Sequence, residues 1–288
     1  MRVVITGAGG QLATELLYTT PKGVDSIGLS IDRCDITSMK NVELALESIQ
    51  PDVIINTAAW TDVDGAESNK DAAFLVNETG ARNIASWAAK NNTYLIHIST
   101  DFVFDGKSDT QYLPSDTPCP INVYGESKLA GEIAVQNIFP DNSLIIRTAW
   151  LYSQHGRNFL NTMLKLFSER DEVRVVNDQI GSPTWARDLA SAIWSTLETK
   201  PIGIAHWVNG GEASWFDFAN AIYKKGLKLE IIKKSVGIIP VSTGEWAAAA
   251  HRPNKCVLSL VNSPIPHPSQ CWVNALSDSM LGSKITTQ

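Results

Sequence analysis

The sequence predicts an α/β fold in which a doubly wound parallel sheet is followed by a smaller C-terminal α/β lobe. Short apolar runs rich in β-branched residues alternate with amphipathic helical patterns through the first half of the chain. These runs are almost continuously apolar, which is typical of parallel strands covered by helices on both faces. A glycine-rich turn also separates the first apolar run from the first helical pattern, as in Rossmann-type folds.

The order of apolar and helical patterns predicts each element in turn. In the first half we expect strands at residues 2–6, 26–29, 52–56, 94–98 and 143–147, and helices at 11–18, 38–49, 71–91 and 123–136. In the second half we expect helices at 158–169, 184–197 and 214–224, and strands at 173–176 and 203–208. We therefore place a dinucleotide-binding domain at residues 1–150 and a mainly substrate-binding lobe at 151–288, with residues from about 184 to 209 returning to the first domain.

Composition narrows the class of protein. The 288 residues are 44% hydrophobic and 19% charged, which suits one large or two modest globular domains. The net charge of -6, without any Lys/Arg cluster, argues against nucleic-acid binding. The four cysteines lack the Cys-x-x-Cys spacing of zinc and redox motifs. No apolar run approaches the roughly 18 residues of a membrane span. Strand-like sequence begins at Arg2, so we expect a cytoplasmic protein without a targeting segment.

The turn after the first strand is suited to phosphate binding. It reads GAGGQLA from Gly7 to Ala13, a relaxed form of the Gly-x-Gly-x-x-Gly fingerprint in which Gly7, Gly9 and Gly10 supply the glycines. Glycines let the backbone approach a pyrophosphate, and the helix N-terminus offers N–H groups and a positive potential. An ordinary strand-to-helix turn is the plainer interpretation. The position directly after an N-terminal strand favours a dinucleotide.

The end of the second strand indicates which dinucleotide. A carboxylate there would bind the ribose 2′-hydroxyl of NAD. Ser30 stands at that place, and Arg33 just beyond it can pair with a 2′-phosphate. We therefore expect NADPH, while Asp32 keeps NADH open. Asp35 can accept a hydrogen bond from the adenine amino group or, alternatively, cap the following helix.

A tyrosine and a lysine share one face of the helix at 123–136. Tyr124 and Lys128 are four residues apart, so one lies above the other. An ammonium beside a phenol lowers the tyrosine pKa from its usual value of about 10, which suits proton transfer near neutral pH. The same spacing also arises by chance on surface helices. The fourth strand ends in Ser99 and Thr100, whose hydroxyls can bind a substrate carbonyl or cap a turn.

Three motifs in this order resemble the extended short-chain dehydrogenase/reductase superfamily: the glycine-rich loop, STDFVFDG from Ser99, and Tyr-x-x-x-Lys. Further segments are similar to the dTDP-4-dehydrorhamnose reductases within it. They are YGESKLAGE from Tyr124, RTAWLY from Arg147, DQIGSPT from Asp178, and Arg252-Pro253. The resemblance covers about residues 1 to 255.

This resemblance implies NAD(P)H-dependent reduction of the C4 ketone of a dTDP-4-keto-6-deoxy-L-sugar, yielding dTDP-L-rhamnose for surface polysaccharide. Tyr124 would protonate the developing alkoxide, Lys128 would hold the nicotinamide ribose and lower the pKa of Tyr124, and Thr100 would bind the ketone oxygen. The cofactor contacts of the family fall on Gly10, Gln11, Leu12, Asp35, Ile36, Ala59, Trp60, Thr61, Tyr124 and Lys128.

The substrate contacts implied by the resemblance are Thr100, Asp101 and Trp150. Arg252 would meet the diphosphate, because arginine presents a fork of donors to phosphate. The plainer interpretations are a core residue for Trp150 and a solvated loop residue for Arg252.

Two alternative functions stay open. The chain could reduce another nucleotide 4-keto sugar. It could also be a non-catalytic NADP-binding regulator, because the fold resembles the regulatory subunit of methionine adenosyltransferase. The presence of Thr100, Tyr124 and Lys128 together favours catalysis.

Oligomeric state is equally open. Some family members form dimers through a magnesium site that includes a glutamate of the first helix, and Glu15 sits at that position. No partner ligands for magnesium are identifiable, so we expect Glu15 to be a solvated residue on the helix face and no metal site.

Overall fold

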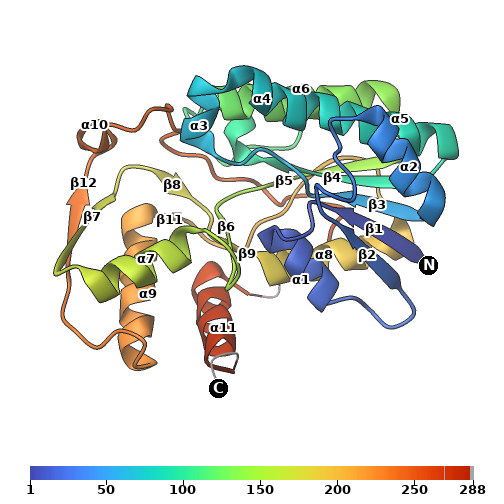
Figure 1. Cartoon of the computed structure of the whole chain (residues 1–288). Coiled ribbons are helices and arrows are strands. Elements are labelled where there is room, and N and C mark those ends of the chain that lie inside the picture. The colour runs from blue at the N-terminus through green and yellow to red at the C-terminus, as the bar shows by residue number, and fades with distance from the viewer. Residues whose placement is uncertain (269, 286–288) are drawn as a thin grey trace.

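The computed structural model describes residues 1–268 and 270–285, and within them six parallel strands form the main sheet (Figure 1). Their order across the sheet is β10-β5-β4-β3-β1-β2. The bounds are β1 (Arg2–Thr6), β2 (Asp25–Leu29), β3 (Val53–Asn56), β4 (Tyr94–Thr100), β5 (Ser143–Thr148) and β10 (Gly203–His206). The strand order reverses at β1, with β2 on one side and β3 on the other. The predicted Rossmann-type α/β fold is confirmed.

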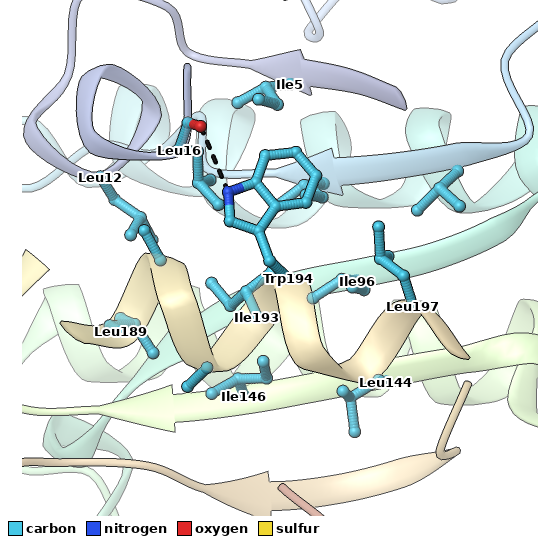
Figure 2. Close-up of a cluster of buried hydrophobic side chains, with 14 of the residues drawn as sticks. Ile5, Leu12, Leu16, Ile96, Leu144, Ile146, Leu189, Ile193, Trp194 and Leu197 are labelled. Atoms are coloured by element: carbon cyan, nitrogen blue, oxygen red, sulfur yellow. Dashed lines mark hydrogen bonds between the residues drawn. The ribbon is translucent and has the colours of Figure 1, made fainter. Parts of the chain in front are cut away.

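Helices α1 (Gln11–Tyr18) and α8 (Ala186–Thr199) cover one face of this sheet. Their apolar side chains interlock with those of the strands in one cluster (Figure 2). Trp194 of α8 inserts between α1 and the sheet, and its Nε1 donates to the carbonyl oxygen of Leu16 at 3.2 Å. The indole therefore ties a segment from the second half of the chain to the first helix.

Helices α2 (Met39–Ile49), α5 (Ala81–Asn91) and α6 (Val123–Ile138) cover the opposite face. Ser38 caps α2 by accepting a hydrogen bond from the backbone N of Asn41 at 3.4 Å. Helices on both faces of the sheet bury β3 and β5 completely, so their few polar side chains, such as Arg147, need partners inside the protein. In both strands every residue is buried.

The prediction of a single helix over residues 71–91 is wrong. The segment is divided into α4 (Lys70–Phe74), a π-helical turn (Leu75–Gly80) and α5, and a short helix α3 (Val63–Ser68) precedes it. The buried Asn77 lies in the π-helical turn, and its side-chain amide bonds to both backbone groups of Trp60. Wider winding at this point places the Asn77 side chain against the loop after β3.

The second lobe packs aromatic and aliphatic side chains of two helices, α7 (Phe159–Glu169) and α9 (Trp215–Lys228), into its own core. Paired short strands surround it: β6 (Leu151–Tyr152) with β9 (Thr184–Trp185), β7 (Glu172–Val176) with β12 (Gly237–Val241), and β8 (Ile180–Gly181) with β11 (Ala213–Ser214). The elements α10 (Thr243–Trp246) and α11 (Trp272–Ile285) complete the described chain. The division at residue 150 stays a prediction.

The sequence did not predict β12, because Pro240 lies within it. A proline lacks the N–H that a central strand needs, but an edge strand tolerates it. Strand β12 pairs only with β7 among the described residues, so it has a free edge.

One buried ion pair fastens α6 to the sheet. Arg147 of β5 donates through Nε and Nη2 to the carboxylate of Glu132 on α6, at 2.9 Å and 2.7 Å. Ser99 of β4 donates to the same carboxylate. Both charged side chains are 1% exposed. Two strands and one helix are therefore joined through a single carboxylate.

We expect Glu132→Gln to lower the free energy of unfolding by about 3–5 kcal/mol, because it leaves the buried Arg147 cation without a counter-charge. Urea titration of the purified protein measures this loss. The control is Glu126→Gln on the same helix, which breaks an exposed pair with Lys70 at 3.1 Å. That change should cost less than about 1 kcal/mol. Equal losses in the two variants would contradict the assigned role of the buried pair.

Candidate active site

The carboxyl ends of the central strands bring most of the predicted site residues to one edge of the sheet. Gly7 follows β1, Ala59 follows β3, Thr100 ends β4 and Trp150 follows β5. Ligands of open parallel sheets bind at this edge, where the strand order reverses.

The loop after β1 has the geometry of a phosphate cradle. Gly7 and Gly9 have φ angles of 74° and 99°, which favour glycine. A Cβ on Gly7 would lie 2.8 Å from the backbone of Ala58, so a side chain is sterically excluded. Gly10 is the N-cap of α1 and has no side chain to satisfy the first N–H groups of the helix. These N–H groups fit a pyrophosphate.

The side chain of Gln11 connects this loop to the second lobe. Its Oε1 accepts hydrogen bonds from Ser153 Oγ at 3.2 Å and from Asn158 Nδ2 at 2.9 Å. Asn158 is also the N-cap of α7. The cofactor loop and the second lobe are therefore held in a fixed relation, and the neighbouring Leu12 is buried beneath them.

Beyond β2, the carbonyl oxygen of Ser30 accepts from the backbone N of Arg33 at 3.0 Å, which closes a turn. The exposed Arg33 guanidinium bonds to the carbonyl oxygen of Gly28 at 3.2 Å. Asp35 accepts from the backbone N of Thr37 at 3.0 Å. It does not cap α2, since Ser38 does, so the capping alternative for Asp35 is wrong.

The loop after β3 presents Ala59 and Trp60, both half-buried, and the exposed Thr61. Ile36 packs beneath the π-helical turn. A Cβ added to Gly80 in that turn would lie 2.5 Å from Cδ1 of Ile36. Asn77 holds the loop by accepting from the backbone N of Trp60 at 2.8 Å. It also donates to Ser127 Oγ at 2.9 Å, so the loop and helix α6 share one anchor.

Tyr124 lies in the first turn of α6, which begins after the N-cap Asn122. Its ring packs edge-on against Phe102, with ring centroids 5.5 Å apart. Lys128 lies one turn further along, and its Nζ donates to the carbonyl oxygen of Ile98 on β4 at 2.7 Å. The first turns of α6 thus place both side chains beside the end of β4, where Thr100 lies.

The acidity of the two groups differs from the sequence-based expectation. Burial raises the pKa of Tyr124 to about 12, although a hydrogen bond with Thr100 opposes the rise. The expected lowering by Lys128 is therefore wrong. Burial also lowers the pKa of Lys128 to about 8, and the charge of Glu132 opposes that change. At neutral pH the phenol is a neutral proton donor, as the reduction of a ketone requires.

Asp101 follows Thr100 and is almost completely buried. Burial raises the pKa of its carboxyl group to about 7. Thr100 Oγ1 donates to Asp101 Oδ1 at 3.0 Å and accepts from the backbone N of Phe102 at 3.2 Å. The hydroxyl of Thr100 therefore caps a turn, as one of its two interpretations expects, and its contact with a substrate carbonyl stays a prediction.

A cavity between the two lobes brings together three of the four predicted substrate residues, whereas Thr100 is not among the residues that line it. Asp101, Trp150 and Arg252 line it. The remaining lining residues are Phe102, Gln179, Ile180, Trp215, Pro253 and Cys256. Trp150 is half-buried and packs on the core of the second lobe, as its core interpretation expects, while its contact with substrate stays a prediction.

Arg252 is not a solvated loop residue. Its Nη2 donates to Asp64 Oδ2 at 2.7 Å, and the ion pair holds the pKa of Asp64 below its usual range. Asp64 lies on α3 and also accepts from the backbone N of Ala250 at 3.0 Å. The guanidinium is thus held at the cavity from the side of the main sheet.

Glu15 differs from its expected solvated state, because its side chain is completely buried. Arg187 of α8 donates to Glu15 Oε2 at 2.7 Å, and His155 Nε2 lies 3.3 Å from Oε1. In residues 1–268 and 270–285, no group of three or more His, Cys, Asp or Glu side chains is arranged to hold a metal ion. The carboxylate is neutralised by a guanidinium.

Comparison with known proteins agrees with this arrangement. The family model described as "RmlD substrate binding domain" matches residues 1–280. This chain belongs to that family. It is 40% identical over 260 residues to the spore coat polysaccharide biosynthesis protein SpsK of Bacillus subtilis, covering 90% of this chain and 89% of that protein. It is 37% identical over 268 residues to the dTDP-4-dehydrorhamnose reductase of Escherichia coli, covering 90% and 89% of the two chains.

A solved structure resembles the whole chain. The dTDP-4-dehydrorhamnose reductase of Bacillus anthracis in complex with NADP is 38% identical and superposes with a TM-score of 0.92, covering 98% of this chain and 99% of that one. The resemblance to this reductase family that the sequence motifs predict is confirmed. No helix within the described ranges is long and apolar enough to cross a membrane.

In this member of the RmlD family, the sequence motifs did not single out Asn77, Asp64 or Trp215. Asn77 falls within the predicted amphipathic helix 71–91 and Asp64 in a segment with no predicted element, and the partners of both are distant in sequence. Trp215 follows the sequence signature of a helix start, Ser214 with Asp217, which draws attention to capping rather than to a site.

We expect Asp101→Asn to change how stability depends on pH. The native carboxyl group keeps its proton up to about pH 7, whereas in the unfolded chain it loses the proton near pH 4. The native state therefore binds more protons between these values, and wild-type stability falls as pH rises through this window. Urea unfolding at pH 4.5 and at pH 7.5 (about the two ends of the window) should show the variant gaining stability relative to wild type. An unchanged difference at both pH values would show that Asp101 is ionised in the native state.

Proposed function

We propose that this chain is an NADPH-dependent reductase that converts dTDP-4-dehydro-L-rhamnose to dTDP-L-rhamnose. The observation that carries the proposal is the placement of Tyr124 and Lys128, one helical turn apart in the first turns of α6, beside the end of β4, where Thr100 lies. The curated and solved relatives named dTDP-4-dehydrorhamnose reductase support the choice of substrate. The similarity to SpsK supports a role of the product in polysaccharide synthesis.

The residues of the cradle fit the cofactor. Gly7 leaves room for a pyrophosphate at the start of α1, and the Ala59–Thr61 loop lies at the adjacent strand end. These residues would hold NADPH, which would supply a hydride for the ketone carbon. The exposed Arg33 suits the 2′-phosphate, and Ser30 does not repel it. The relative from Bacillus anthracis was solved with NADP, which supports the same cofactor here.

Proton transfer is assigned to the chain's own residues. Tyr124 donates its phenolic proton to the oxygen that becomes an alkoxide as the carbonyl is reduced. The Thr100 hydroxyl turns from Asp101 Oδ1 to donate to that oxygen, and this bond strengthens as negative charge develops there. The Lys128 ammonium stabilises the phenolate that Tyr124 leaves, and Glu132 behind it favours the protonated form of Lys128.

We expect Tyr124→Phe to lower kcat by about 10²- to 10⁴-fold, because it removes the general acid but keeps the ring. NADPH oxidation with dTDP-4-dehydro-L-rhamnose measures the rate, and fluorescence titration checks that NADPH still binds. The control is Tyr112→Phe, whose hydroxyl donates instead to Asp105 at 2.7 Å. Full activity of the Tyr124→Phe variant would show that Tyr124 is not the proton donor. If the wild-type protein binds NADP tightly but does not turn over the substrate, the proposed reductase activity is wrong.

Replacing Arg33 tests the cofactor. Arg33→Ala should weaken NADPH binding by about tenfold, because one charge-assisted hydrogen bond to phosphate is lost. NADH binding should not change, since NADH lacks the 2′-phosphate. Titration of both cofactors measures the two dissociation constants, and Arg82→Ala, on the exposed side of α5, is the matched control. Equal weakening of NADPH and NADH would contradict the proposed contact.

A further inference from the structure

The indoles of Trp150 and Trp215 form a face-to-face stack at the substrate cavity. Their ring centroids are 3.5 Å apart and their planes differ by 3°. Trp150 comes from the end of β5 and Trp215 from the first residue of α9, so the stack joins the main sheet to the second lobe. Both rings are half-buried and line the same cavity as Asp101 and Arg252.

The stack is held from several sides. Trp150 has a φ of 45°, a left-handed conformation that is unfavourable for a residue with a bulky side chain. A Cβ on Gly181 would lie 2.5 Å from the Trp150 ring, so strand β8 closes on one indole face and only glycine fits there. Trp215 packs against the other face. The conformation of Trp150 therefore depends on its two neighbours.

Trp215 is itself fixed in orientation. Its Nε1 donates to Gln179 Oε1 at 3.2 Å. Gln179 in turn donates from Nε2 to Thr243 Oγ1 at 3.1 Å. The indole also contacts Phe159, with ring centroids 4.6 Å apart and planes 45° apart. These contacts fix the orientation of Trp215, while its half-buried ring still lines the cavity.

We propose that Trp215 is a specificity-determining residue, which with Trp150 forms an aromatic wall that recognises the apolar edge of the 6-deoxy sugar. This inference rests on the proposed function. A 6-deoxy sugar presents a methyl group and C–H groups where a common hexose presents a hydroxymethyl group. Aromatic rings pack favourably against such groups. Asp101 and Gln179 lie in the same cavity and suit the sugar hydroxyls, while Arg252 suits the diphosphate.

Trp272 shows that membership of the aromatic cluster is not sufficient for this role. It packs against Phe218 with ring centroids 5.9 Å apart, and its Nε1 donates to the carbonyl oxygen of Glu212 at 3.3 Å. Trp272 belongs to the same core cluster as Trp215 but does not line the cavity. It is therefore a matched control for the purely structural contribution of a tryptophan in this lobe.

The test compares the affinities of dTDP-L-rhamnose and of dTDP, measured by calorimetry with the NADP-loaded protein. The two ligands share the nucleotide, so general loosening of the lobe weakens both and leaves their ratio unchanged. We expect Trp215→Phe to weaken dTDP-L-rhamnose by about three- to tenfold, because part of the aromatic contact is lost. The affinity for dTDP should stay within about twofold, as expected for a contact made only by the sugar. Trp215→Leu, which lacks an aromatic face, should weaken the sugar nucleotide further. Trp272→Phe should leave the ratio of affinities unchanged.

Steady-state kinetics provide a second measurement on the same variants. Trp215→Phe should raise KM for the keto sugar and retain kcat, because the wall contributes equally to ground-state and transition-state binding. A ratio of affinities that is unchanged in both Trp215 variants, or altered equally in Trp272→Phe, would overturn the inference. If the wild-type protein turns over the substrate, such a result leaves the proposed reductase function intact. If the wild-type protein neither turns over the keto sugar nor distinguishes the two ligands, both proposals fall.

Discussion

The buried pair of Arg147 and Glu132 is the interaction on which the site depends most. It connects β5 to α6, and Ser99 adds β4 to the same carboxylate. Glu132 lies one helical turn after Lys128, so the pair that positions the helix also influences the charge of the lysine. Burying two charged groups away from water costs free energy, which is offset only when the pair has good hydrogen-bond geometry. The bidentate geometry meets this condition and, in return, fixes how deeply α6 lies on the sheet.

The site is divided between two parts of the chain that supply different chemistry. The main sheet and α6 carry the glycine-rich loop, Thr100 and Tyr124. The second lobe carries Gln179 and Trp215, which line the cavity. The relation between them is fixed by polar contacts at α1, where Gln11 bonds to Asn158 and Glu15 bonds to Arg187. The first helix therefore has a glycine N-cap at the loop after β1 and contacts the second lobe through its side chains.

Sequence patterns predicted those parts of the fold that depend on local periodicity. The continuously apolar strands gave the parallel sheet, and Tyr124 with Lys128 followed from helical spacing. The π-helical turn at Asn77 did not follow, because its cause is contact with Trp60 and Ser127, which come from other elements. The tyrosine pKa was also predicted in the wrong direction. Helical spacing shows that Lys128 is near Tyr124. It does not show that the phenol is buried or that the Lys128 ammonium bonds to the carbonyl oxygen of Ile98, because both depend on the tertiary structure.

The ion pair of Arg252 with Asp64 is compatible with phosphate binding by the same guanidinium. An arginine side chain has five N–H donors. In this structure Nη1 donates to Asp64 Oδ1 and to the carbonyl oxygen of Ala250, both at 3.1 Å, and Nη2 donates once to Asp64 Oδ2. Among the described residues, Nε–H and the second Nη2–H make no hydrogen bond, and together they form the fork that suits a phosphate. Asp64 therefore orients the guanidinium from behind and leaves its free edge for the diphosphate. The same carboxylate reduces the net positive charge of the pocket, so recognition there depends on geometry more than on charge.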